Sequence, residues 1–334
     1  MTKQNQKIGL LAATSLVVGN IIGAGIFVLP ASLGKFGSIS IVGWLFTATG
    51  ALILAKIFSN FSKKLKGKSG GPYIYSKVVF GDFIGFLVAW GYWISCWVNN
   101  AAIAVAIVSA LSFFFPELVT NPFYATLTGL SFIWFFTFTS SKGIKSSGNI
   151  QILTTIAKLI PLVLIILFGF FIFDLEIFPE FNLTDQNDFE ILPVVAVMTL
   201  YAFLGLECAS IPAENIKNPE KTIPKATMVG TLISTLIYIL STIVLFGIIP
   251  AENLINSPAP FAEAGEIIGG KYFGFLISAG AAISAIGALN GWILITSYMP
   301  MTMANDRLFP KVFAKKNKKG FPYLSLLLGS ILTS

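Results

Sequence analysis

Long runs of apolar residues, separated by short polar segments, alternate along the whole chain. The runs are continuous rather than alternating residue by residue, so they predict membrane-spanning helices and not the strands of a barrel. A helix satisfies its own backbone N–H and C=O groups in hydrocarbon. We predict eight complete spans and a partial ninth, with approximate limits 8–30, 38–58, 81–115, 122–140, 149–173, 191–211, 226–249, 271–301 and 322–334. The pattern therefore predicts an all-α polytopic membrane protein with one transmembrane domain over residues 1–334.

Composition supports this interpretation and excludes several other functions. The chain is 55% hydrophobic and 11% charged, whereas soluble domains carry about 25% charged residues. Cys96 and Cys208 both lie in apolar segments and histidine is absent, so we expect no disulfide, metal site, cofactor or enzyme active site. The net charge of +7 comes from lysines in short loops. This pattern favours a lipid bilayer as the partner and not nucleic acid.

Charge also predicts the orientation of the spans. Acidic residues concentrate in the loops 174–190 and 252–266. Most basic residues fall in the alternate segments 1–7, 63–77, 142–145, 217–225 and 307–319. Since basic loops stay in the cytoplasm, we predict a cytoplasmic N-terminus in a cell inner or plasma membrane.

Two spans contain an interruption of small or polar residues. GNIIGAGIFVLP occupies 19–30 and LYAFLGLECASIP occupies 200–212. The two segments lie five spans apart, so they run in opposite directions, as inverted repeats with broken helices do. An unwound segment offers N–H groups to a carboxylate and C=O groups to an ammonium, which an α-amino acid presents together. Alternatively, Gly19 and Gly23 only allow close helix packing.

Two ionisable residues lie well inside predicted spans, where each costs at least about 2.5 kcal/mol. Glu207 could complement a cationic substrate or carry a coupling proton. Lys158, in TTIAKLIPL, could carry a proton, provide a fixed charge or bind backbone carbonyls. The sequence alone leaves these alternatives open.

Several motifs, in order along the chain, resemble the amino acid–polyamine–organocation superfamily. They are GNIIGAGIFVLP, SGGPYIYSKVVFG, KNPEKTIPKA and NDRLFPKVFAKKNKKGFP. Two further segments are most similar to the basic amino acid/polyamine antiporters, and these are GYWISCWVNNAAIAVAIVSALSFFFP and TLYAFLGLECAS. The resemblance implies a leucine-transporter-like inverted-repeat fold with broken spans one and six. The first repeat would cover about 8–173 and an incomplete second repeat about 191–334.

The resemblance also implies a substrate site. The backbone around Ile21, Gly23, Ala24 and Gly25 would bind the substrate carboxylate, and Ala202, Phe203 and Leu204 would lie near its amino group. Tyr201 stands where the antiporters have a stacking tryptophan, and Ala24 stands where they have a serine. Trp292 matches a second aromatic gate. The polar residues of spans three and six that match the site are Tyr92, Cys96, Asn100 and Glu207. Lys158 matches a lysine of proton-coupled and heteromeric amino-acid transporters, where it replaces sodium.

The predicted function is secondary transport by alternating access, with cationic amino acid/polyamine exchange preferred. Proton-coupled amino-acid symport is one alternative. Because the superfamily usually has twelve spans, a truncated, non-transporting remnant is another. The expected partners are a small-molecule amino acid or polyamine, the bilayer, and either a second copy or a complementing C-terminal polypeptide.

Overall fold

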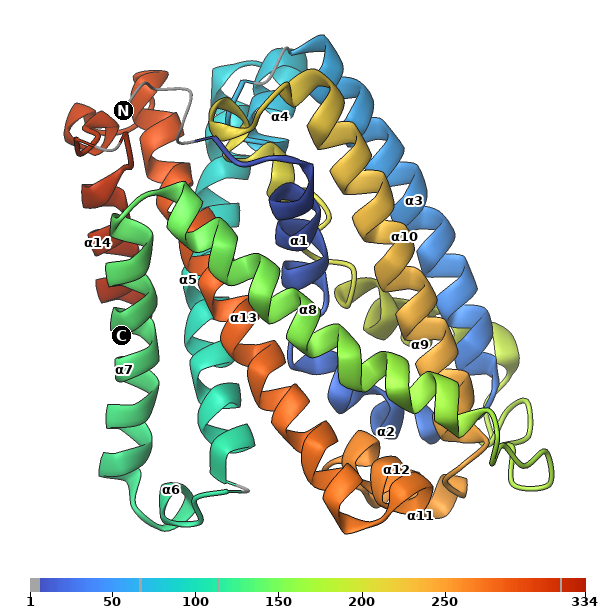
Figure 1. Cartoon of the computed structure of the whole chain (residues 1–334). Coiled ribbons are helices and arrows are strands. Elements are labelled where there is room, and N and C mark those ends of the chain that lie inside the picture. Colours follow the sequence, from blue (N-terminus) through green and yellow to red (C-terminus); the bar gives the residue numbers. More distant parts are fainter. Residues whose placement is uncertain (1–6, 66–67, 113, 319) are drawn as a thin grey trace.

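The computed structural model describes residues 7–65, 68–112, 114–318 and 320–334. Lys3, Lys66 and Lys319, which contribute to the predicted charge pattern, lie outside the described residues. Helices make up nearly all the regular structure of the described residues, and they pack into one bundle (Figure 1). Five of them are long and apolar enough to cross a membrane: α3 (Ile39–Lys64), α5 (Asp82–Ser112), α8 (Ile144–Gly169), α10 (Pro219–Phe246) and α13 (Lys271–Asn305). This confirms a helical, multi-pass membrane protein.

The other hydrophobic segments form shorter helices. They are α1 (Leu10–Ile21), η2 (Gly25–Phe27), α2 (Leu29–Gly34), α7 (Pro122–Ser141), α9 (Asp188–Tyr201), η3 (Cys208–Ser210) and α14 (Tyr323–Thr333). Connecting segments contain α4 (Pro72–Phe80), α6 (Glu117–Thr120), η4 (Ala213–Asn215), α11 (Ala251–Asn256), α12 (Pro260–Gly269) and η5 (Lys311–Ala314). Figure 1 shows α4 at one end of the bundle and α6, α11 and α12 at the other.

The glycines of the first hydrophobic segment have two different structural roles. Gly19 lies inside α1 and packs against α8, where an added Cβ would collide with Gln151 and lie 2.8 Å from Thr155 Oγ1. Gly23 lies beyond the end of α1, where the nearest atom to an added Cβ would be 3.8 Å away. Gly25 begins η2 and has no such neighbour within 4 Å. Close packing therefore explains Gly19, whereas Gly23 and Gly25 lie in the interruption of the helix.

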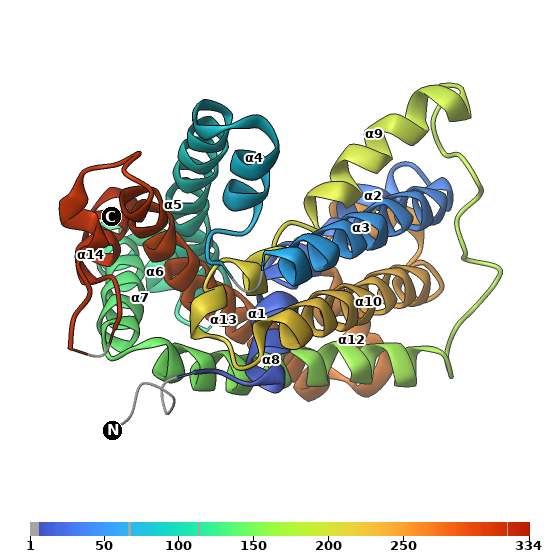
Figure 2. The same cartoon turned by 90° about the horizontal axis from the view of Figure 1, so that it is seen from above.

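A second interruption, after α9, crosses the first one at close range. Gly205 has φ +113°, and an added Cβ would lie 3.0 Å from the backbone of Asn20 and Ile21. Glycine is the residue that tolerates both this conformation and this approach. Asn20 Nδ2 also donates a hydrogen bond to Cys208 Sγ at 3.0 Å. The two interruptions, distant in sequence, therefore meet in the middle of the bundle, where α1 lies (Figure 2).

Candidate functional site

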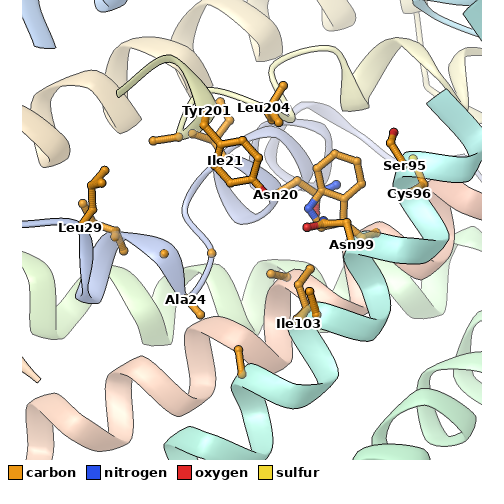
Figure 3. Close-up of a pocket in the computed structure, with 18 of the residues that line it drawn as sticks. Asn20, Ile21, Ala24, Leu29, Ser95, Cys96, Asn99, Ile103, Tyr201 and Leu204 are labelled. Carbon is orange, nitrogen blue, oxygen red and sulfur yellow. The ribbon is translucent and has the colours of Figure 1, made fainter. Parts of the chain in front are cut away.

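A cavity of about 410 Å³ lies where the two interrupted segments face α5 (Figure 3). Its lining comes from the ends of α1 and α9 and from faces of α5, α10 and α13. Most of the residues proposed from the sequence line it: Ile21, Gly23, Ala24, Gly25, Tyr92, Cys96, Tyr201, Ala202, Leu204, Glu207 and Trp292.

Backbone N–H groups are available on one wall of the cavity. Ala24, Gly25 and Ile26 line it, and in the described part of the chain none of their N–H groups has a hydrogen-bond acceptor. They precede or begin η2, so no earlier helical turn supplies a carbonyl. Three adjacent donors of this kind can bind a carboxylate.

Backbone carbonyls are available on the opposite side. Tyr201 ends α9, and the next residues form turns rather than a helix. Leu204 lines the cavity, and among the described residues no N–H or side chain donates to its carbonyl. The carbonyl of the preceding residue, Phe203, also has no donor there, although Phe203 itself does not line the cavity. Carbonyl oxygens left free in this way can accept hydrogen bonds from an ammonium group.

Glu207 is the one carboxylate among the residues that line the cavity, and neither lysine nor arginine lines it. Its Oε1 accepts a hydrogen bond from Tyr92 OH at 2.6 Å, and its Oε2 accepts one from Gly205 N at 3.2 Å. Both oxygens of the carboxylate therefore have a hydrogen-bond donor. Tyr201 and Trp292 add aromatic faces, which attract cations by about 0.5–2 kcal/mol. The cavity is therefore suited to a cation that also carries a carboxylate.

Two of the residues proposed to form the substrate site, Asn100 and Phe203, do not line the cavity. Asn100 is buried between α5 and α13, where its Nδ2 donates to Thr296 Oγ1 at 3.0 Å. Phe203 is buried and packs edge-on against Trp44 and Tyr238. Asn100 follows Cys96 by four residues, so it lies at the edge of the α5 face that lines the cavity, and its side chain is directed to α13 instead.

Lys158 lies behind the interrupted first segment and does not line the cavity. Its side chain is fully buried, and its Nζ donates to the carbonyls of Gly19 at 2.9 Å, Ile22 at 2.6 Å and Ser284 at 3.1 Å. An ammonium group has three N–H donors, so all of them are used. The contacts fit a protonated lysine that holds the unwound backbone in place.

The sequence interpretation missed several lining residues. They include Asn20, Ser95, Asn99, Ile103 and Tyr238. Ser95, Asn99 and Ile103 are spaced four residues apart on one helix, and this spacing could have identified Ser95 and Asn99 as polar residues of the lining. Tyr238 gave no such signal, yet its hydroxyl lies 2.7 Å from Ile21 O and 3.1 Å from Ala202 O, so it bridges the two interruptions.

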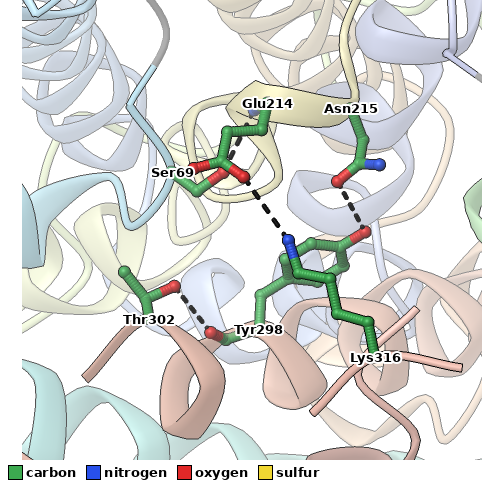
Figure 4. Close-up of polar contacts among 6 residues, drawn as sticks. All are labelled: Ser69, Glu214, Asn215, Tyr298, Thr302 and Lys316. Atoms are coloured by element: carbon green, nitrogen blue, oxygen red, sulfur yellow. Dashed lines mark hydrogen bonds and ion pairs between the residues drawn. The ribbon is translucent and has the colours of Figure 1, made fainter. Parts of the chain in front are cut away.

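Polar contacts join several segments at the end of the bundle where α4 lies (Figure 4). We call it the lysine-rich end, because Lys63, Lys221 and Lys316 lie there. Lys316 Nζ lies 3.6 Å from Glu214 Oε2, Tyr298 OH donates to Asn215 Oδ1 at 3.2 Å, and Glu214 N donates to Ser69 Oγ at 3.0 Å. The segment after η3 is therefore attached both to α13 and to the segment before α4.

A second cluster at the same end joins α4, α5 and α13. Asp306 Oδ2 accepts from Tyr73 OH at 2.5 Å and lies 3.0 Å from Lys77 Nζ, which also pairs with Asp82. Burial acts to lower the pKa of Lys77, but its bonds to Asp306 and Asp82 outweigh burial and raise it. Burial raises the pKa of the neighbouring Tyr75 to about 12.

The cavity extends away from these contacts. Asp82 begins α5 at the lysine-rich end, whereas the lining continues along α5 to Ala106 and along the first segment to Leu29. The polar contacts therefore close one end of the bundle and the cavity extends toward the other.

Comparison with known proteins gives a consistent result. Residues 8–334 match the amino acid permease family. The chain is 34% identical to a cadaverine/lysine antiporter of Escherichia coli over 98% of its own length and 73% of the relative. It is 33% identical to an arginine/ornithine antiporter of Pseudomonas aeruginosa, covering 98% and 70%. A solved Na+-coupled sialic acid symporter shares the fold, with a TM-score of 0.65, 17% identity and coverage of 98% and 73%.

Proposed function

Because the chain belongs to the amino acid permease family, we propose that it is a secondary transporter that exchanges cationic amino acids for polyamines by alternating access. The observation that carries this proposal is the composition of the cavity, where Glu207 is the one carboxylate and no basic side chain opposes it. The names of the antiporter relatives support the same substrate class.

The available backbone groups suggest how the substrate binds. The N–H groups of Ala24, Gly25 and Ile26 would hold the α-carboxylate, together with the backbone of Ile21 and Gly23. The carbonyls of Phe203 and Leu204, with Ala202 beside them, would accept from the α-ammonium group. A polyamine lacks the carboxylate, so it would leave the N–H groups of the first segment unused.

The side chains would recognise the cationic end of the substrate. Tyr201 is 68% exposed, so its face is free to stack on a cation, and Trp292 provides a second face. Glu207, held by Tyr92, would complement the positive charge. Cys96 borders this part of the cavity, and Asn100 would act indirectly, by fixing α5 against α13.

The close crossing of the two interruptions supports an inverted-repeat arrangement. The first repeat would cover about 8–173 and the second about 191–334, with broken spans one and six contributing equivalent halves of the site. Such an arrangement lets one repeat move against the other around a central substrate. The contact of Gly205 with Asn20 and Ile21 would form the pivot.

Lys158 would act as a fixed cation. Its three carbonyl partners are ligands of the type that bind Na+, and the ammonium occupies their centre. Transport would then not require sodium. Proton-coupled symport is the second candidate, since Lys158 and Glu207 are both buried groups that could release or take up a proton.

The distribution of charge and the shape of the cavity support an orientation. With a cytoplasmic N-terminus in the cell membrane, the contacts of Figure 4 would close the cytoplasmic end, and the cavity would face outward. Pairing with a second copy or with a complementing polypeptide stays a prediction.

Uptake into proteoliposomes tests the function. Labelled lysine, arginine, ornithine and leucine are supplied outside, with cadaverine or buffer inside. We expect internal cadaverine to stimulate uptake of the three cationic amino acids and not of leucine. Equal uptake without internal amine would contradict exchange, and accumulation driven by a proton gradient alone would favour symport.

A matched pair of variants tests the role of the cavity carboxylate. Glu207→Gln should lower uptake of cationic substrates at least tenfold, because the cavity loses its negative charge. Glu252→Gln removes the same charge from an exposed position on α11, away from the cavity, and should leave uptake unchanged. Equal effects of the two substitutions would remove Glu207 from the mechanism.

A further inference from the structure

A second cavity lies on the outer surface between α3 and α10, at the lysine-rich end of the bundle. Its volume is about 410 Å³. Its polar lining contains four lysines and one glutamate, a net charge of +3: Lys56, Lys63, Lys221, Lys225 and Glu220. We name these residues, with Ser59 and Asn60, the basic groove. The proposed transport mechanism uses none of them.

Helical periodicity places the basic groove on two facing helices. Lys56, Ser59, Asn60 and Lys63 follow a spacing of three or four residues, so they share one face of α3. On α10 the lining residues likewise share one face of its first turns. The helices meet directly beneath the groove, where Ser59 Oγ lies 3.4 Å from Pro224 O.

The lysines of the groove have no charged partner in the described structure. All four are exposed, and the ion pairs of the described residues involve only Lys77 and Lys316. Glu220 lines the same groove without reaching any of them. Four unpaired ammonium groups converging on one hollow form a site for an anion.

The surface next to the groove is apolar and uncovered. On α3, Ile53 and Ile57 are exposed before and after Lys56, and on α10 the exposed side chains of Val229, at the edge of the groove, and of Leu232 and Leu236 continue at helical spacing. Side chains of this kind on a membrane helix face lipid. The apolar side chains border the lysines on both helices, so an occupant would combine an anionic head with a long apolar tail.

We propose that the basic groove binds an anionic phospholipid of the cytoplasmic leaflet, with its phosphate among the four lysines and its acyl chains along α3 and α10. Basic pockets between membrane helices bind anionic head groups in this way. The long lysine side chains extend from the apolar surface to the level of the head groups. Bound lipid would hold α3 against α10, and α10 contributes Tyr238 to the transport cavity.

Lipid retention measured by native mass spectrometry tests this proposal. The whole protein is reconstituted with equal amounts of phosphatidylglycerol and phosphatidylcholine that have identical acyl chains. It is then released from the bilayer, and the mass of the protein with its retained lipids is measured. Wild type should retain phosphatidylglycerol preferentially. Replacing Lys56, Lys63, Lys221 and Lys225 with Gln should reduce that preference at least tenfold, because each lysine near an anionic lipid favours binding several-fold. These side chains are exposed and unpaired, so we expect the variant to fold.

The control removes four other exposed lysines from the same end of the bundle: Lys145, Lys311, Lys315 and Lys318. It has the same net charge and should keep the preference of wild type. Equal loss in the two variants, or an unchanged preference in the groove variant, would overturn the proposal. Excess inorganic phosphate should not displace the lipid, since it has no acyl chains. Displacement by phosphate would show a simple anion site instead.

Discussion

Replacing Lys158 with methionine tests whether this lysine holds the interrupted first segment. Methionine has a similar length but no N–H donor. Gly19 O would lose its one hydrogen-bond donor in the described structure, because Gly23 N donates to Ile21 O instead. Ile22 O would also lose its donor, because the single hydroxyl hydrogen of Ser284 is directed to Gly23 O at 2.9 Å and lies farther from Ile22 O, at 3.4 Å. Ser284 O lies within α13 and would keep its helical bond.

The magnitude follows from the carbonyls that lose their partner. A buried acceptor without a donor costs about 1–3 kcal/mol, so two of them cost about 2–6 kcal/mol. Burying methionine avoids the desolvation of an ammonium, which offsets part of this loss. We therefore expect Lys158→Met to lower the free energy of unfolding by about 2–3 kcal/mol.

Thermal unfolding of the purified protein in detergent measures this effect. The control is Lys145→Met at the start of the same helix, where the side chain is exposed and the expected change is within about 0.5 kcal/mol. If both variants have the melting temperature of wild type, Lys158 does not stabilise the first segment. Sodium should stabilise Lys158→Ala, which frees the carbonyls, but not wild type. Equal stabilisation of both by sodium would contradict the role of a fixed cation.

Three further predictions follow from neighbouring contacts. Gly25→Ala should weaken substrate binding about tenfold, because the added methyl group would lie beside the free N–H groups; the melting temperature should not change, because no atom lies within 4 Å of it. Gly205→Ala should instead destabilise the fold by more than about 1 kcal/mol, because the backbone φ of this residue is +113°. Tyr75→Phe should reduce the loss of stability between pH 10 and 12. In that range Tyr75 ionises in the unfolded protein but stays neutral in the folded one, where its pKa is about 12, so stability falls as pH rises. Identical profiles of stability against pH for wild type and Tyr75→Phe would refute this. Lys316→Met should cost less than about 1 kcal/mol, since its pair is partly exposed. Asp306→Asn should cost more, because Asp306 binds both Tyr73 and Lys77; the reverse order in unfolding measurements would refute the assignment.

Local sequence was sufficient to predict the helical, multi-pass architecture, and the family resemblance named about half of the residues that line the cavity. Long apolar runs have few alternatives in a bilayer, because only hydrogen-bonded helices satisfy the backbone there. Glycines and polar residues inside such runs mark interruptions, so Gly23, Gly25 and Glu207 could be proposed as site residues before any tertiary structure was known. The structure places all three at the cavity.

Tertiary packing decided what each residue contacts. Nothing in the chain near Gly19 shows that Gln151 lies against it, and nothing near Lys158 identifies the carbonyls of Gly19, Ile22 and Ser284 as its partners. Asn100 follows Asn99 directly, yet the rotation of α5 turns only Asn99 to the cavity. Sequence determined which segments enter the membrane, because hydrophobicity is a local property. The three-dimensional packing determined which polar atoms meet, because each such contact joins segments far apart in the chain.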